Sequence, residues 1–183
     1  MTLGFIILGL LMDKSMTGYD LKTFFKNSVN FFWSAELSQI YRELSKLEKQ
    51  GYVSSKTEYQ EGRPNKKLYN VTAEGQAVFL KWLMEFPTNL VPISRNEFLV
   101  RIFFSSKLSN DELIHQLRRY ILQQEEDERV CRLIEERLNS RISDSQSSNE
   151  AFHHRLTVRR GIYFAQSEIK WANECIEEIT KQQ

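Results

Sequence analysis

Cysteine and long apolar runs are scarce in this chain of 183 residues, and each scarcity excludes a class of protein. The two cysteines, Cys131 and Cys175, lie far apart and in helical patterns, so we expect reduced thiols in the cytoplasm and not a disulfide framework. The longest apolar run, from Phe5 to Met12, is too short to cross a membrane, and no basic residue precedes it as in a signal peptide. The sequence therefore predicts a cytoplasmic protein with no membrane partner.

An excess of charge of one sign is also missing, because 25 Lys and Arg residues face 24 Asp and Glu residues and leave a net charge of +1. This balance excludes a strongly basic protein, although a reader of a DNA groove needs only a local basic patch. The motifs of common enzymes are absent too: there is no glycine-rich phosphate loop, no HExxH and no GxSxG. The adjacent His153 and His154 diverge by about 100° on a helix, which does not suit one metal ion. We expect neither an enzyme nor a cofactor or metal site.

The segment from Trp33 to Thr72 organises the rest of the chain, and its first half has the pattern of an amphipathic helix. Ser34 is the expected N-cap of this helix, and Gly51 is the expected stop. Apolar residues recur at steps of three and four and predict a core face of Leu37, Ile40, Tyr41, Leu44 and Leu47. The other face is polar and consists of Ser38, Gln39, Arg42, Ser45, Lys46 and Lys49. A helix of this kind fits the major groove of DNA.

After Gly51 the pattern changes from helix to hairpin. Residues 53–59 alternate as in a strand, residues 61–65 have the composition of a turn, and Lys66 to Val71 returns as a second strand. Three cations and no acid lie between residues 62 and 67, and these are Arg63, Lys66 and Lys67. Helix, hairpin and basic tip together predict a winged helix-turn-helix, with an ordinary surface helix and a solvated hairpin as the alternative.

The helix that precedes this reader helix is expected to open at Thr17, with Asp20 as its capping partner. In a helix-turn-helix this element crosses the DNA backbone, so Tyr19 and Lys22 can meet phosphates. The alternative for Tyr19 is a packed aromatic residue with a satisfied hydroxyl group.

Two further helices are predicted in this N-terminal domain, which we place at residues 1–87. Thr2 to Asp13 is apolar nearly all round and is expected to be buried, while Thr72 caps a helix that extends to Phe86. Pro87 and Pro92 mark the boundary to a C-terminal domain of residues 93–183.

The C-terminal domain is predicted to be all-helical. We expect a short helix over residues 96–106, a long helix from Ser109 to Ser143 that starts with a capping box, and a loop over residues 143–149. The stretch from Gln123 to Arg129 is entirely polar, so we expect the middle of the long helix to be solvated or to lie on a polar partner.

The last helix carries the clearest periodicity in the chain. Its residues at alternating steps of four and three form an a/d seam of Val158, Ile162, Ala165, Ile169, Ala172, Ile176 and Ile179. Phe164, Trp171 and Cys175 form a second apolar stripe beside the seam. One stripe can pack on the helix from Ser109 and the other on a second chain, so we predict a dimerisation surface here. The alternative is a single-chain helical hairpin without a partner.

Several short stretches resemble one family of proteins, and they are Thr17-Gly18-Tyr19-Asp20-Leu21, Ile40-Tyr41-Arg42-Glu43-Leu44, Leu47-Glu48, Gly51-Tyr52-Val53, Lys67-Leu68-Tyr69, Thr72 and Gly75. The chain resembles the PadR-like bacterial transcriptional regulators, in the longer branch with a virulence-activator-type α-helical C-terminal region. The resemblance implies a homodimeric winged-helix regulator, usually a repressor, that binds a two-fold operator. It also implies a small aromatic or phenolic effector in some members, for which Trp82, Phe103 and Trp171 are candidate lining residues, or else ordinary core aromatics. Asn65 stands where a further basic residue is expected.

The predicted fold is therefore mainly α, with an N-terminal winged helix-turn-helix of three to four helices and a β-hairpin wing, followed by an all-helical dimerisation domain. The predicted DNA-binding residues are Tyr19, Lys22, Ser38, Gln39, Tyr41, Arg42, Lys46, Lys49, Arg63, Lys66 and Lys67. We expect Ser38, Gln39 and Arg42 to meet base edges, and the lysines and Arg63 to meet phosphates. The alternative is a winged-helix module that uses the same face on a protein partner, and the salt sensitivity of binding separates the two.

Overall fold

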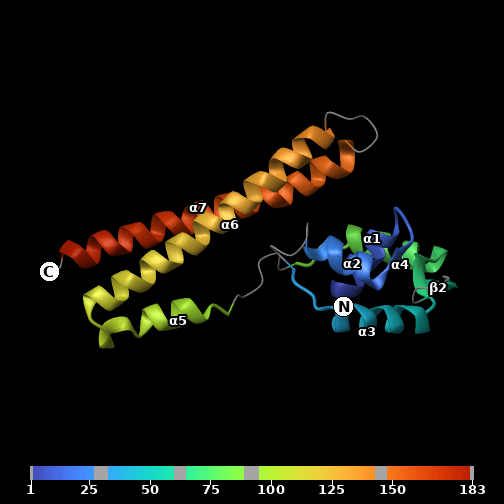
Figure 1. Ribbon diagram of the computed structural model, residues 1–183, viewed down its shortest axis with the longest axis horizontal. Coiled ribbons are helices and arrows are strands. Elements are labelled where there is room, and N and C mark those ends of the chain that lie inside the picture. Colours follow the sequence, from blue (N-terminus) through green and yellow to red (C-terminus); the bar gives the residue numbers. More distant parts are fainter. Residues whose placement is uncertain (1, 27–32, 60–64, 89–94, 143–147, 182–183) are drawn as a thin grey trace. The chain divides into compact units, whose positions relative to one another are not determined.

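The fold is described from a computed structural model of the chain, in which residues 2–26, 33–59, 65–88, 95–142 and 148–181 are described. The chain forms two compact units, Met1–Pro92 and Ile93–Gln183. Figure 1 shows both units.

The N-terminal unit combines helices with a small antiparallel sheet. Its helices are α1 (Thr2–Leu11), α2 (Gly18–Phe24), α3 (Leu37–Lys49) and α4 (Ala73–Met84). Its strands β1 (Met16–Thr17), β2 (Val53–Glu58) and β3 (Lys66–Val71) lie in the order β1-β3-β2. The predicted hairpin is thus present as β2 and β3, paired from Val53 opposite Val71 to Glu58 opposite Lys66. The two-residue strand β1, which the sequence pattern did not predict, adds a third strand on the other side of β3.

The core of this unit is built on the apolar face of α3. Ile40, Leu44 and Leu47 are buried there, together with a set from the other elements that comprises Ile7, Leu8, Leu11, Met16, Leu21, Phe25, Ala35, Val53 and Tyr69. Full burial of a side chain of this size stabilises a fold by about 1.5–3 kcal/mol. Tyr41 was placed on this face by its spacing, but its side chain is 44% exposed. The burial of the other residues holds α3 with its polar face outward.

The ends of the helices agree with the sequence in most places. Thr17 and Asp20 form the predicted reciprocal capping box, and the Thr72 hydroxyl accepts a hydrogen bond of 3.1 Å from the Gly75 N–H. Gly51, which follows the C-cap residue Gln50 of α3, has a φ of +76° and ends the helix as predicted.

The start of α3 differs from the prediction. Ser34 is not its N-cap, because the helix begins two residues later, after Glu36. The Gln39 side chain accepts a hydrogen bond of 2.7 Å from the Glu36 N–H, so the capping partner lies inside the predicted reader face.

The C-terminal unit is a long antiparallel helical hairpin with a short helix against it. It consists of α5 (Glu97–Phe103), the 3-10 helix η2 (Ser105–Lys107), α6 (Asn110–Ile142) and α7 (Ser148–Lys181). Figure 1 shows α6 and α7 side by side along their length. The capping box of Ser109 and Glu112 is present as predicted. The predicted loop ends earlier, since α7 already includes residues 148 and 149, and residues 143–147 lie outside the described part.

The hairpin buries residues at coiled-coil spacing. On α6 these residues are Leu117, Gln124, Cys131 and Leu138, and on α7 they are Ala151, Val158, Ile162, Ala165 and Ala172. The middle of α6 was expected to be solvated or to face a polar partner, and most of residues 123–129 are exposed, with Gln124 as the buried exception at 8% exposure. Nearby, the Gln166 side chain donates a hydrogen bond of 2.9 Å to Glu128, so the polar partner is α7 of the same chain.

An aromatic cluster fixes α5 to the hairpin. The Phe98 ring stacks on the Tyr120 ring at 4.2 Å, and Trp171 meets both rings edge-on. The Tyr120 hydroxyl donates a hydrogen bond of 2.7 Å to Glu168. The pKa of Tyr120 is raised well above its ordinary value, mainly by burial and to a smaller extent by this hydrogen bond to a carboxylate.

Candidate nucleic-acid interface

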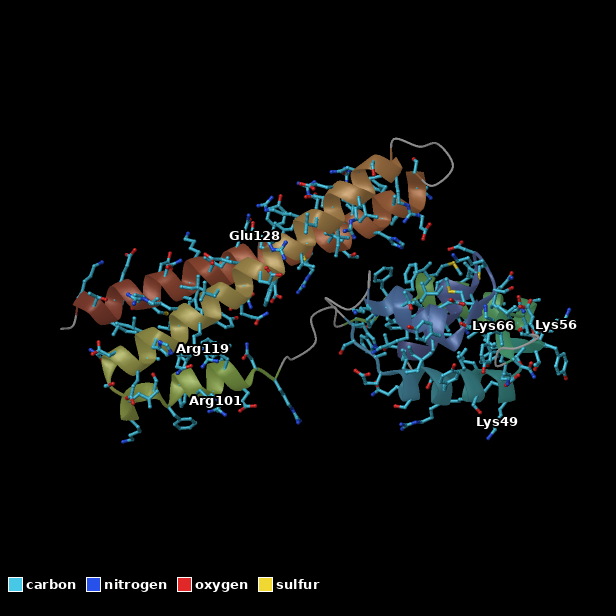
Figure 2. All side chains as sticks on the ribbon, viewed as in Figure 1. Lys49, Lys56, Lys66, Arg101, Arg119 and Glu128 are labelled. Carbon is cyan, nitrogen blue, oxygen red and sulfur yellow. The ribbon has the colours of Figure 1, made fainter. Side chains whose placement is uncertain are left out.

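A stripe of exposed polar side chains runs along α3 on the side opposite its buried face. Its members are Ser38, Arg42, Ser45 and Lys49, at steps of four, three and four residues, and we call them the reader stripe. Figure 2 shows Lys49 projecting from α3 away from the rest of the unit. Among the described residues, no side chain binds any of these four by a hydrogen bond or an ion pair. Their donors are therefore available to a partner.

The chemistry of the reader stripe suits DNA. A guanidinium group such as that of Arg42 can donate two parallel hydrogen bonds to a guanine, and a serine hydroxyl can bond to either kind of base edge. An ammonium group such as that of Lys49 pairs with phosphate as a point charge. Ser45 was recognised in the sequence as part of the polar face but was not among the predicted binding residues, although the helical spacing already put it between Arg42 and Lys49.

Three of the predicted contacts beside the stripe are engaged within the chain. The Gln39 side-chain oxygen caps α3, as described above. Lys46 lies 3.4 Å from Glu43. Lys22 donates to Glu36 at 3.1 Å and to the carbonyl of Ala35 at 2.9 Å. Ion pairs this exposed contribute about 0–1 kcal/mol, so a phosphate can compete for either lysine.

Two tyrosines lie where α2 meets α3. Tyr41 covers Gly18, the first residue of α2, so closely that a Cβ atom on Gly18 would stand 2.5 Å from the ring. The glycine thus permits the close approach of the two helices that form the helix-turn-helix. Tyr19 follows directly on α2 and is 69% exposed, which makes the alternative of a packed core aromatic wrong.

The two lysines of the wing differ in their surroundings. Lys66 and Lys67 are neighbours on β3, so their side chains leave opposite faces of the hairpin. Lys66 is exposed, and its positive charge helps to lower the pKa of Asp20, after the larger effect of the Thr17 hydrogen bonds. Lys67 instead pairs with Glu48 of α3 at 3.0 Å and lies 5.1 Å from the centre of the Tyr69 ring. Arg63 and most of the predicted turn lie outside the described residues.

One further lysine of the hairpin was missed by the sequence reasoning. Lys56 of β2 is exposed and stands opposite Leu68 in the register. Because Leu68 is two residues from Lys66, both lysines belong to the same face of the hairpin. Figure 2 labels both residues in the N-terminal unit. The strand alternation that predicted β2 was the signal that could have found it.

The residues predicted to form the dimer surface lie largely between α6 and α7. Val158, Ile162, Ala165 and Ala172 are buried within the single chain, and Ile169, Ile176 and Ile179 are partly covered. Their first role is therefore to hold the hairpin together. Other apolar residues of the hairpin remain exposed, and these are Leu122, Val130, Leu133, Phe152, Leu156, Tyr163 and Phe164.

The candidate effector aromatics are divided between the two units, with Trp82 in the N-terminal unit and Phe103 and Trp171 in the C-terminal unit. Trp82 stacks on Phe5 at 4.6 Å within the N-terminal unit, and Trp171 belongs to the aromatic cluster of the C-terminal unit. Phe103 is 81% exposed. In the described ranges no three His, Cys, Asp or Glu side chains gather as metal ligands. Nor does a helix of these ranges combine the length and apolar character that a membrane crossing requires.

Comparison with known proteins assigns both units. Residues 7–81 match the transcriptional regulator PadR-like family, and residues 94–180 match the family described as virulence activator alpha C-term. The N-terminal unit belongs to the PadR-like transcriptional regulator family, and the C-terminal unit belongs to the virulence activator alpha C-term family. Among curated relatives of this PadR-like regulator, the negative transcriptional regulator PadR of Bacillus subtilis is 27% identical over 179 residues, which is 98% of each chain. The predicted family and fold class are confirmed.

Solved structures of related proteins have the same fold. Bacillus subtilis PadR in complex with operator DNA is 29% identical, with a TM-score of 0.86 and coverage of 97% of both chains. The Vibrio cholerae virulence activator AphA is 28% identical, with a TM-score of 0.76 and coverage of 99% of both chains. Bacillus subtilis PadR in complex with p-coumaric acid is 26% identical, with a TM-score of 0.75, and the match covers 98% of this chain and 99% of that one.

Proposed function

We propose that this PadR-like regulator binds a two-fold operator as a homodimer and represses the promoter that contains it. The observation that carries the proposal is the reader stripe, a row of exposed donors on α3 with no partner among the described residues. The operator complex of a relative that is 29% identical supports it. A homodimer would place its two α3 helices in successive major grooves, with half-sites about 34–36 Å apart.

Within this interface the residues divide by chemistry. Arg42 and Ser38 read base edges, with Gln39 beside them at the start of α3. Lys49, Lys46, Lys22 and Tyr19 meet phosphates, as do Lys66 and Arg63 from the wing. Tyr41 lies against Gly18 and contributes contact next to Arg42.

The homodimer in this proposal forms through the helical hairpin. Ile169, Ile176 and Ile179 of the predicted seam remain partly accessible, and the exposed apolar residues of α6 and α7 extend that surface. Exposed apolar patches of this kind usually mark an interface. The buried members of the seam support the surface from inside by keeping α6 and α7 together.

A small phenolic or aromatic molecule is the effector class that we propose, because a relative has been solved with p-coumaric acid. We propose no cofactor and no enzymatic activity. A regulator of promoters must share the compartment of the chromosome, so the proposed location is the cytoplasm, where the thiols of Cys131 and Cys175 would stay reduced.

The experiment that tests the function is a gel mobility shift with promoter DNA from upstream of the gene for this protein, or with DNA selected from a random pool. We expect a discrete shift that weakens with salt. Arg42→Ala should lose about 1–3 kcal/mol of specific binding per protomer and much less of non-specific binding. Arg119→Ala is the matched control, since Arg119 is an exposed arginine of the C-terminal unit (Figure 2), and it should leave binding unchanged.

Two results would contradict the proposal. Equal losses of specific and non-specific affinity in Arg42→Ala would remove the role of Arg42 in reading bases. If no selected DNA binds at any salt concentration, a winged-helix module for a protein partner becomes the better function. The net charge of +1 favours that second candidate, because it provides little general attraction to DNA.

A further inference from the structure

A single carboxylate connects the reader helix to both strands of the wing. Ser55 of β2 donates a hydrogen bond to Oε1 of Glu48, and Nζ of Lys67 of β3 donates to Oε2 at 3.0 Å. Each oxygen of the Glu48 side chain is thus held by a different strand. Tyr69, which is buried, lies opposite Ser55 in the register and beneath the Lys67 ammonium group.

Lys67 and its neighbour Lys66 lie on opposite faces of the hairpin. Thr57 and Ser55 of β2 face Lys67 and Tyr69 of β3, so all four residues share one face of the hairpin. That face includes the core residue Tyr69 and meets the end of α3. Lys66 leaves the other face, where among the described residues no side chain forms an ion pair with it.

We infer that Lys67 is a positioning residue, which fixes the wing to the C-terminal half of α3 through Glu48 and Ser55 and does not itself bind a phosphate. This inference rests on the proposed DNA-binding function and replaces, for Lys67, the phosphate contact predicted from the sequence. The inference also explains why an acidic residue, Glu48, lies next to a surface that is proposed to bind DNA. An unpaired carboxylate there would repel phosphates, whereas the paired one sets the angle between wing and helix.

The two possible roles of Lys67 predict opposite changes in DNA affinity when Glu48 is substituted. If Lys67 bound a phosphate, Glu48 would compete with the DNA, and Glu48→Gln would tighten binding or leave it unchanged. If Lys67 positions the wing, Glu48→Gln removes the negative charge that holds the Lys67 ammonium group and weakens binding, even though the glutamine oxygen can still accept the hydrogen bond from Ser55. Ser55→Ala should act in the same direction, although the serine is uncharged and partly buried.

The test measures the affinity of the full-length protein for the selected promoter DNA at three salt concentrations. A partly exposed ion pair contributes a factor of about 2 to 5 per protomer, so loss of the pair should weaken binding by a homodimer about 4-fold to 25-fold. We expect this loss for Glu48→Gln and for Lys67→Ala, and no further loss for the double variant. The dependence of affinity on salt should stay as in the wild type, and Lys67→Arg should retain binding within about 2-fold, because arginine can pair with Glu48.

Lys66→Ala is the matched control, since it removes the same charge one residue away. It should lower the salt slope by about 0.9 per lost phosphate contact, which a positioning residue does not do. Circular dichroism at the assay temperature checks that each variant is folded.

The inference is overturned if Glu48→Gln binds as well as the wild type, if Lys67→Ala lowers the salt slope as a phosphate contact would, or if the two losses add. A wild-type protein that binds no DNA would instead show that the proposed function itself is wrong, and the inference would fall with it. The wild-type lane alone distinguishes that failure from the others.

Discussion

The contact between Gly18 and Tyr41 offers a direct test of how α2 and α3 are held together. An alanine at position 18 would place its Cβ atom 2.5 Å from Cε1, 2.6 Å from Cζ and 2.9 Å from the hydroxyl oxygen of Tyr41. Carbon atoms in favourable contact stand about 3.5–4.0 Å apart, so the two groups cannot occupy these positions together. The Tyr41 side chain is 44% exposed and can move outward, whereas the helix that carries it is fixed by its buried residues.

Two opposing terms determine the free energy of unfolding of Gly18→Ala. Displacing the ring removes contacts on its buried side, which costs about 1–3 kcal/mol as in other overpacked sites. Replacing a helical glycine by alanine contributes up to about 1 kcal/mol in the other direction. We therefore expect a net destabilisation of about 0–3 kcal/mol. In a Tyr41→Ala background only the second term remains, so the same substitution should be neutral or stabilising by up to about 1 kcal/mol.

The assay is urea unfolding of four proteins: the wild type, the two single variants and the double variant. Circular dichroism reports the transition, and the coupling free energy from the cycle should equal the cost of displacing the ring, about 1–3 kcal/mol. The reasoning is refuted if Gly18→Ala costs the same with and without the tyrosine ring, because the ring is then not what the new methyl group meets.

Three further predictions concern stability. Gly75→Ala should cost about 3 kcal/mol or more in urea unfolding, because its Cβ atom would stand 2.1 Å from the backbone carbonyl oxygen of Tyr52, which cannot swing aside; a cost below about 1 kcal/mol would contradict this. Two hydrogen bonds from Thr17 lower the pKa of Asp20, so this carboxylate stabilises the fold above its unfolded pKa of about 3.9 and loses that contribution as the pH falls through the folded value. The free energy of unfolding of Asp20→Asn should therefore fall less steeply below about pH 4 than that of the wild type. If urea unfolding gives the variant the same pH dependence as the wild type between about pH 3 and pH 7, the assignment is contradicted. Leu117→Ala should destabilise the helical hairpin by about 2–5 kcal/mol in urea unfolding, because Leu117 is only 1% exposed, and a loss below about 1 kcal/mol would contradict this.

The elements that sequence reasoning located correctly are those whose signals are local. Spacing of three and four residues predicted α3 and α7, and the alternation after Gly51 predicted β2 and β3. Capping by Thr17 and Thr72 was readable for the same reason, since the partners of each cap lie within three residues. The polar face of α3 followed directly from the helical period.

The features that were missed depend on residues far apart in the sequence. Strand β1 exists only because Met16 and Thr17 pair with β3, and a strand of two residues is too short to show an alternating pattern in the sequence. Gln124 looked like part of a solvated stretch, but its position seven residues from Leu117 and Cys131 puts it on the side that α7 covers. For the same reason, the seam of α7 could not reveal whether its first partner was another chain or α6.

The sequence by itself therefore determined the order of the helices and strands apart from β1, and the exposed face of the reader helix, because each of these follows from the period of a single element. The class of the protein was readable from the short stretches that resemble the PadR-like family. Only the tertiary structure decided which charges remain available on that face. Lys66 and Lys67 are indistinguishable as neighbours in the sequence, yet the strand directs them to opposite faces and brings Lys67 alone to Glu48. The physical reason is that a side chain's partners are set by the packing of distant elements, which the local pattern does not contain.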